Sequence, residues 1–404
     1  MSAASLSERM NGALTAEAKH LKESVGSIVM SDFIYGLFIF ALGVTYFGIP
    51  LGSAVSIILV THASTRKAHY SDPRLNLFIV IAVLAVAYTT ISSVVFGVST
   101  VDETLRRAFR IFIVILLALF IGDKRIDARS LIFGIATGMI INAIAYYTGI
   151  APDAYTGFLT GWLGDKNVSG LWYAFIGLLF FTYLDDRKKK LLAFILFSIL
   201  LWETGSRTSL AGYIFALLWL TFGKKIGFVT KILLAAFIVW AVDYLTENYA
   251  HVGVFANRDG SDLLRARIDT ATLEKVSQTP WHGQGFGQAY VFLPGGDSRW
   301  LFHNSFYTLF VEGGWIWMFA VLLITLLATV FWKQRPQKGK ERIIVAEAAI
   351  VLLAICSWRL GEVILTIPWA IVVGIGLSYL VKPEDAIAFY KEQNYLRNVE
   401  RPEL

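Results

Sequence analysis

The sequence predicts an all-α integral membrane protein with about twelve transmembrane helices, and three observations carry that prediction. Of its 404 residues, 56% are hydrophobic and only 16% are charged, with a mean hydropathy of +0.60. Long apolar runs recur along the chain, as expected for membrane spans. The polar residues gather in short loops and in one long interval, residues 247–302. This distribution is not that of a soluble domain.

The apolar runs give the expected helices in order. Separations at 48–50 and 203–207 are so short that either pair of runs could instead form a re-entrant hairpin. We find no repeat and no second domain, so residues 1–404 are predicted to form a single polytopic membrane domain. The twelve runs lie near 31–48, 50–63, 75–97, 107–122, 130–149, 170–184, 191–203, 208–223, 226–246, 304–332, 343–357 and 363–381.

The basic residues of the short loops predict the orientation, because cytoplasmic loops carry an excess of Lys and Arg. They alternate consistently to one face, which places the tails 1–30 and 382–404 in the cytoplasm. The loop 247–302 then lies in the periplasm of a bacterium, as do the turn at Arg207 and the loop at Arg359. Arg106, Arg107 and Arg110 depart from the pattern, with Asp102 and Glu103 close enough to offset part of their charge. The bases that set the pattern are Arg66, Lys67, Arg74, Lys124, Arg125, Arg129, Arg187, Lys188, Lys189, Lys190, Lys224, Lys225, Lys333, Arg335, Lys338, Lys340 and Arg342.

The net charge of +6 does not indicate nucleic-acid binding, because most of the bases lie in loops that set topology. The single cysteine, Cys356, lies in an apolar run. No disulfide framework and no cysteine metal site are therefore expected.

The long interval 247–302 contains the pattern of an amphipathic helix, with Ser261 or Asp262 as its N-cap. Arg265 and Asp269 are four residues apart on that helix. They could form a surface ion pair worth under about 1 kcal/mol, or Arg265 could contact a substrate. The apolar positions that define the helix are Leu264, Ile268, Ala271 and Val276.

Two residues at the ends of apolar runs are further candidates. Arg207 lies between two runs, where an arginine either contributes to function or extends to the membrane interface. Several arginines that converge from different loops would suit a pyrophosphate, because guanidinium offers paired donors to phosphate. His303 begins a run, and histidine is either structural there or a general base, since its ordinary pKa is near neutrality.

Two other sites are weighed for the same interval. A metal site could use His251, His282 and His303, but their spacings match no zinc motif. The glycine turn 283–287, GQGFG, resembles a phosphate cradle, yet it lacks the strand and helix of a nucleotide motif. It fits a tight bend or a hinge better. We expect neither a metal nor another cofactor.

Three motifs together resemble the O-antigen ligase and polymerase superfamily of bacterial envelopes. The first is Ser-Arg-Thr at 206–208, and the second is Arg265 followed by Pro280 and the glycine turn. The third is His303-Asn304 with Gly314 eleven residues after the histidine. Trp317 stands where ligases often have glycine, threonine or tyrosine. The motifs cover residues 206–317, and the twelve-span layout extends the likeness along the chain.

The resemblance implies a GT-C-like glycosyltransferase of the bacterial inner membrane. A ligase would transfer O-antigen from undecaprenyl pyrophosphate to a sugar hydroxyl of lipid A–core, with inversion and without a metal. Its partners would be these two substrates and membrane lipid. Arg207 and Arg265 would hold the pyrophosphate, and His303 would activate the acceptor. The candidate substrate-binding residues are Asn304, Arg267, Arg299 and Arg359.

Three alternatives are kept open. A polymerase of the superfamily would use a second lipid-linked repeat as acceptor, and a protein-directed oligosaccharyltransferase would use a protein hydroxyl. A transporter or flippase for polyprenyl-linked glycans belongs to another class. It would explain the spans and the buried arginines, but not a long structured loop on one face.

Overall fold

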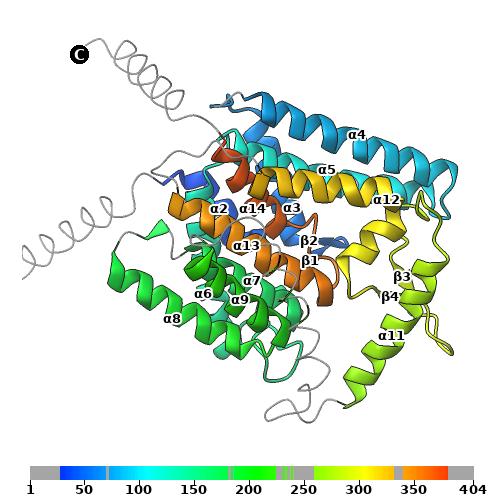
Figure 1. Ribbon diagram of the computed structural model, residues 1–404. Coiled ribbons are helices and arrows are strands. Elements are labelled where there is room, and N and C mark those ends of the chain that lie inside the picture. Colours follow the sequence, from blue (N-terminus) through cyan, green and yellow to red (C-terminus); the bar gives the residue numbers. More distant parts are fainter. Residues whose placement is uncertain are drawn as a thin grey trace, which may run out of the picture.

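The computed structural model is mostly helical, at 71% of residues, as the sequence predicts (Figure 1). It describes residues 28–69, 72–180, 183–184, 186–223, 259–331 and 340–380, with four isolated positions between 230 and 240. The predicted tails 1–30 and 382–404, the run 226–246 and the first part of the loop 247–302 fall wholly or mostly outside these residues. The description below concerns the residues that the structure describes.

Each of the eleven predicted apolar runs that the structure describes contains a helix. A further helix, α11, lies in the long polar interval, where a helix was also expected. The α-helices are α2 (Met30–Ile39), α3 (Leu51–Ser64), α4 (Pro73–Val95), α5 (Val101–Gly122), α6 (Ala128–Tyr147), α7 (Lys166–Phe180), α8 (Arg187–Glu203), α9 (Arg207–Phe222), α11 (Asp259–Ser277), α12 (Ser305–Leu326), α13 (Lys340–Arg359) and α14 (Ile367–Ser378). A 3-10 turn, η1 (Gly161–Leu163), and a π-helical turn, η4 (Leu327–Phe331), complete the helical elements.

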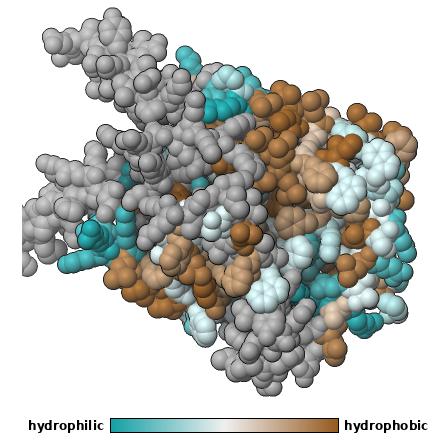
Figure 2. Space-filling view, viewed as in Figure 1, coloured by the Kyte–Doolittle hydropathy of each residue, from teal (hydrophilic) through white to brown (hydrophobic). Residues whose placement is uncertain are grey.

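Three helices are long and apolar enough to cross a membrane: Pro73–Val95, Ala128–Tyr147 and Ser305–Val330. The α4 helix presents Leu77, Leu84 and Ile91 to the outside, and α12 presents Phe319 in the same way. Figure 2 shows such apolar surface as a broad brown area between hydrophilic patches at the left and right edges. A soluble protein would not leave so much apolar surface exposed.

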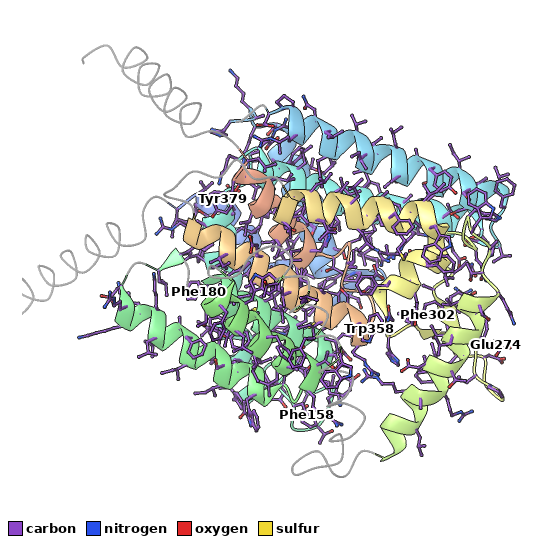
Figure 3. The ribbon with its side chains drawn as sticks, viewed as in Figure 1. Phe158, Phe180, Glu274, Phe302, Trp358 and Tyr379 are labelled. Atoms are coloured by element: carbon purple, nitrogen blue, oxygen red, sulfur yellow. The ribbon has the colours of Figure 1, made fainter. Side chains whose placement is uncertain are left out.

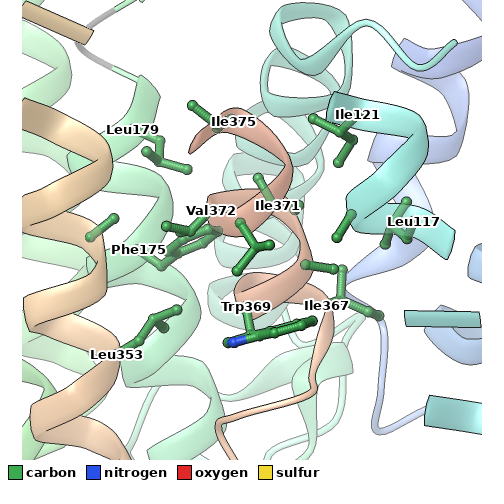
Figure 4. Close-up of a cluster of buried hydrophobic side chains, with 14 of the residues drawn as sticks. Leu117, Ile121, Phe175, Leu179, Leu353, Ile367, Trp369, Ile371, Val372 and Ile375 are labelled. Carbon is green, nitrogen blue, oxygen red and sulfur yellow. The ribbon is translucent and has the colours of Figure 1, made fainter. Parts of the chain in front are cut away.

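The α14 helix forms the centre of the bundle. All twelve of its residues are buried, which is the pattern of a helix surrounded by others. In Figure 4 its side chains meet Leu117 of α5, Phe175 of α7 and Leu353 of α13. The indole of Trp369 donates to Thr325 of α12 over 3.0 Å. This helix is short, and it holds together the longer helices that carry the candidate site.

Two of the loops that were predicted to share a basic face lie together in the described residues. Arg66 pairs with Asp32 of α2 and donates to the carbonyl of Arg125 over 2.7 Å. The amide of His69 donates to the carbonyl of Asp123, and Arg74 donates to the carbonyl of Leu380 after α14. The α3–α4 loop, the α5–α6 loop and the end of α14 therefore occupy one end of the bundle.

The first two apolar runs are not two long helices. The α2 helix covers only the first ten residues of its run, and α3 has 14 residues. At 1.5 Å per residue, neither spans the ~30 Å hydrocarbon core alone. Between them β1 (Thr45–Tyr46) pairs with β2 (Ile49–Pro50) in a hairpin. The apolar composition correctly predicted helices in both runs. The turn at Gly48 makes these helices shorter than the runs.

The α12 helix is interrupted at Gly314, where φ is 68° and ψ is −163°. The glycine turn 283–287 fills the interruption. The amides of Gln284 and Gly285 donate to the carbonyls of Val311 and Glu312, and the amide of Trp315 donates to the carbonyl of Trp281 over 3.0 Å. The backbone groups that the break leaves without helical partners are thus hydrogen-bonded within the protein. Such pairing is required inside a membrane, where no water is present to bind them.

Candidate functional site

The candidate site begins with α11, which packs on the outer part of α12. Ile268 is 3% exposed and shares a small core with Phe302, Val311 and the hairpin of β3 (Tyr290–Val291) and β4 (Trp300–Leu301). This confirms the predicted helix, although it begins at Asp259, before Ser261 and Asp262. Because residues four apart share a helix face, the same packing turns both Arg265 and Asp269 toward α12 and α13.

Asp269 pairs with His303, and this pair is the centre of the site. Its Oδ1 lies 3.1 Å from Nδ1 of His303. Both side chains are partly exposed, at 38% and 27%. A carboxylate at Nδ1 fixes the ring and its tautomer, which leaves Nε2 to accept a proton. The expected ion pair between Asp269 and Arg265 is therefore replaced, because the carboxylate turns to the histidine.

Arg265 reaches the end of α13 instead. Its Nη2 donates to the carbonyl of Arg359 over 3.2 Å. Two residues later in the chain, the amide of Gly361 donates to the carbonyl of His303 over 2.8 Å. The segment 359–361 thus joins Arg265 and His303, which come from separate motifs. Figure 3 shows Phe302 and Trp358 on the side of the bundle that faces α11, with Glu274 pointing away from them.

Arg207 lies at the same end of the molecule. The α9 and α13 helices are antiparallel neighbours, since Gly212 faces Leu352 and Cys356 while Gly223 faces Ile344. This register brings Arg207, the first residue of α9, level with the last residues of α13. Arg207 and Arg359 are both half-buried. Four of the predicted residues, including Arg265 and His303, therefore gather where α9, α11, α12 and α13 end.

Asn304 has a structural role that the sequence did not reveal. Its side-chain oxygen accepts from the amides of Phe306 and Tyr307 at 2.9 and 3.2 Å, so it caps α12. Such a cap stabilises a helix by about 1 kcal/mol. The ring of the neighbouring His303 is oriented by Asp269. The cap fixes the start of the helix that presents His303.

Two other predicted arginines are not gathered with these. Arg267 is exposed and lies two residues from Arg265, a spacing that does not share a helix face. Arg299 pairs with Glu103 at 3.2 Å and lies over the Tyr290 ring at 4.6 Å. That ring lies near the C-terminal part of α11, roughly 15 Å along the helix from Arg265.

Lys275 marks that far end of α11. It donates to the carbonyls of Gln288 and Tyr290 at 2.7 and 2.8 Å, which attaches the β3–β4 hairpin to the helix. Burial lowers the pKa of Lys275 to about 8. The ammonium is still charged at neutral pH, so this attachment should loosen only under alkaline conditions.

A buried ion network, missed by sequence reasoning, lies beside the interruption in α12. Arg107 is 7% exposed and pairs with Glu312 at 3.0 Å and with Glu362 of the α13–α14 loop. Arg110 also approaches Glu362, at 3.6 Å. Although burial alone would raise the pKa of Glu362, the two arginines lower it and keep it ionised. A signal was present: Glu312 is the only charged residue in the run 304–332, and charges in spans are costly.

The network accounts for two of the three arginines that depart from the basic-loop pattern. Arg107 and Arg110 are paired with acidic residues from elsewhere in the chain, so their charges are offset within the protein. Only Arg106 pairs with Asp102, as expected. Glu312 also accepts from the amide of Gly287 over 3.0 Å, which ties the glycine turn to the network.

The glycine turn is a tight bend, as one of the two alternatives predicted. Gly283, Gly285 and Gly287 all have positive φ, between 83° and 106°, a region that favours glycine. Its amides donate to the α12 backbone, to the Glu312 carboxylate, to the Ser93 hydroxyl of α4 and to the Pro280 carbonyl, so those amides are engaged by the protein.

The two described histidines of the proposed metal set have different neighbours. The ring of His282 packs on Phe96 at 5.1 Å between centroids, whereas His303 pairs with Asp269. Among the described residues, no group of three or more His, Cys, Asp or Glu side chains could hold a metal ion. His251 lies outside them, and metal independence stays a prediction.

The site combines a partly exposed carboxylate–histidine pair with arginines from two other helices. Such a pair can accept a proton, and the arginines can bind an anionic group. No family model and no curated protein matches the chain.

Proposed function

We propose that the protein is an O-antigen ligase of the bacterial inner membrane. It transfers O-antigen from undecaprenyl pyrophosphate to a sugar hydroxyl of lipid A–core. The proposal includes twelve spans, a GT-C-like fold and a site that faces the periplasm. The observation that carries it is the Asp269–His303 pair one helical turn from Arg265. Residues of two of the motifs that resemble the superfamily, Arg265 and His303, thereby lie at one site, and Arg207 of the third motif lies at the same end of the bundle.

The reaction is a single inverting displacement. The acceptor hydroxyl oxygen bonds to the anomeric carbon while the bond from that carbon to the pyrophosphate oxygen breaks. His303 takes the hydroxyl proton at Nε2, and Asp269 stabilises the resulting imidazolium. Arg207 and Arg265 offset the charge that develops on the departing undecaprenyl pyrophosphate. Positive charge from arginines serves here in place of a metal ion.

The direct test is to incubate purified protein with lipid-linked O-antigen and lipid A–core. We expect a joined glycolipid and free undecaprenyl pyrophosphate. Product formed with a second lipid-linked repeat or with a protein acceptor, but not with lipid A–core, would reassign the enzyme as a polymerase or an oligosaccharyltransferase. Absence of covalent transfer to all three acceptors would reject the enzyme class.

Substitutions of Arg265 test its predicted role in the same assay. Arg265→Ala should abolish transfer, and Arg265→Lys should restore little, because a point charge cannot make paired contacts with phosphate. Arg106→Ala is the matched control, since this exposed arginine pairs only with Asp102 among the described residues. Near-normal transfer by Arg265→Lys would show that charge alone is needed and would remove the paired-donor role.

A transporter is the second candidate, because α12 is an interrupted helix beside a buried ion network. Transporters often bind substrate at such interruptions. Here the glycine turn already pairs the released backbone groups of α12, which argues against a substrate site in the break. Movement of intact lipid-linked glycan across proteoliposomes, without any joined product, would favour the transporter.

A further inference from the structure

A groove at the surface of the bundle lies between α6 and α8. Its volume is about 320 Å³. Ile140, Ala143 and Ile144 of α6 form one wall, and Leu196 and Leu200 of α8 form the other. Both helices pack on α7, which also packs on α9.

The groove offers almost nothing polar to an occupant. Its two remaining lining residues are Tyr147 and Thr148, at the end of α6. The Tyr147 hydroxyl donates to Glu203 over 3.0 Å, and the Thr148 hydroxyl donates to the carbonyl of Ile144 over 2.9 Å. With these hydroxyls engaged, the surface that remains suits a hydrocarbon chain.

The position of the groove relates it to the candidate site. It follows the last two turns of α6 and the last two turns of α8, the halves remote from the basic loops. The contact between Tyr147 and Glu203 closes its end. Glu203 is the last residue of α8, and the short turn that follows leads to Arg207 at the start of α9. A chain in the groove would therefore end close to Arg207.

We propose that this groove holds the first part of the isoprenoid chain of a polyprenyl-linked donor, with its phosphates directed toward Arg207. This inference rests on the proposed function and adds the place where the lipid part of the donor binds. Lipid tails are as apolar as the groove, so moving the isoprenoid chain from the bilayer into the groove contributes little affinity. The role of the groove is to align the chain, and thereby the phosphates, with the arginines.

The test fills the groove and compares two donors, one with a long polyprenyl chain and one with a short prenyl chain. Ala143→Trp and Leu196→Trp each place an indole in the groove. We expect kcat/KM for the long-chain donor to fall several-fold, because its phosphates are no longer aligned with the arginines, and both constants for the short-chain donor to stay normal. Ala87→Trp, on the exposed face of α4, is the matched control.

A second measurement does not depend on turnover. A photoreactive long-chain polyprenyl phosphate should cross-link to α6 or α8 in the wild-type protein, and far less in Leu196→Trp. Equal labelling in both proteins, or an unchanged kcat/KM for the long-chain donor in both tryptophan variants, would overturn the proposal. So would equal impairment with both donors, which would indicate damage to the fold. If no donor is transferred by the wild type, the ligase proposal fails, and the cross-link still decides whether the groove binds the chain.

Discussion

At the scale of single residues, Asp269 determines what His303 can do. A histidine at the start of an apolar run is compatible with a purely structural role. The Asp269 carboxylate, 3.1 Å from Nδ1, instead gives the ring a defined orientation beside Arg265 and the end of α13. Chemistry at this site therefore depends on a residue of α11, a helix outside the predicted spans.

We predict that His303→Ala lowers turnover by about 10²–10⁴-fold, the usual contribution of a general base. Asp269→Asn should also lower turnover, since an amide cannot stabilise the imidazolium. Donor affinity should stay normal in both variants, because the arginines are unchanged.

Turnover and donor affinity, measured separately in the purified variants, check this prediction. Glu274→Gln is the control for Asp269→Asn, because Glu274 is an exposed carboxylate on the same helix. If donor affinity collapsed in His303→Ala while bound donor still reacted at the normal rate, His303 would be a donor-binding residue.

At the scale of elements, the interruption of α12 and the glycine turn depend on each other. Gly314 has a backbone conformation that only glycine adopts readily, and a Cβ there would meet the Trp281 carbonyl. Such strained positions cost about 1–3 kcal/mol each before any clash is counted. The turn is consequently part of the packed bundle.

We therefore predict that Gly314→Ala destabilises the protein and disturbs the packing of 281–287. Gly296→Ala should be close to neutral, because no atom lies within 4 Å of a Cβ there and φ is not positive. Apparent melting temperatures of the two variants in detergent provide the comparison. A Gly314→Ala protein as stable as Gly296→Ala would show that the interruption relaxes easily.

The buried network is a second element-scale feature, since it joins α5, α12 and the α13–α14 loop. Arg107→Ala would leave Glu312 with only the Gly287 amide as a partner among the described residues. Breaking a buried ion pair in this way typically costs about 3–5 kcal/mol. Arg106→Ala should cost less than about 1 kcal/mol, because Arg106 is 74% exposed.

Thermal unfolding of the two arginine variants tests this difference. If Arg107→Ala and Arg106→Ala lost equally little stability, the network would not stabilise the fold. Arg107→Lys is a useful addition, because it retains charge while losing contact with two separate carboxylates. We expect it to lie between wild type and Arg107→Ala.

At the scale of the whole molecule, the loops fall at two ends of the bundle. One end carries Arg66, Asp123 and the residues after α14. The other carries the glycine turn, whose Gln284 carbonyl accepts from Val98 after α4. We predict that the first end is cytoplasmic and the second periplasmic.

Cysteine labelling tests that orientation in a Cys356→Ser background. An impermeant maleimide should label Gly296→Cys in cells with only the outer membrane permeabilised. Ser64→Cys, exposed at the end of α3, should react only after the inner membrane is opened. The reverse pattern would place the candidate site in the cytoplasm and would refute the ligase mechanism.

The sequence by itself determined the class of the protein and most of its helices. Runs of apolar residues have few stable alternatives to helix in a membrane, and the period of Leu264, Ile268 and Ala271 was sufficient to locate α11. It also selected Arg207 and His303, which lie at the ends of apolar runs, and Arg265, which lies on the helix of the polar interval and belongs to one of the three motifs. The short α2 and the hairpin after it were missed, because a turn at Gly48 outweighs local hydrophobicity.

Only the tertiary structure decided which side chains act together. Asp269 could pair with Arg265 by local spacing, yet its partner is His303, 34 residues away in the sequence. Glu312, Arg107 and Glu362 come from three separate segments, so no local pattern predicts their network. The hydrophobic pattern fixes which residues enter a helix, but the packing of α11 against α12 and α13 determines which polar groups meet. The contacts between these polar groups define the candidate site.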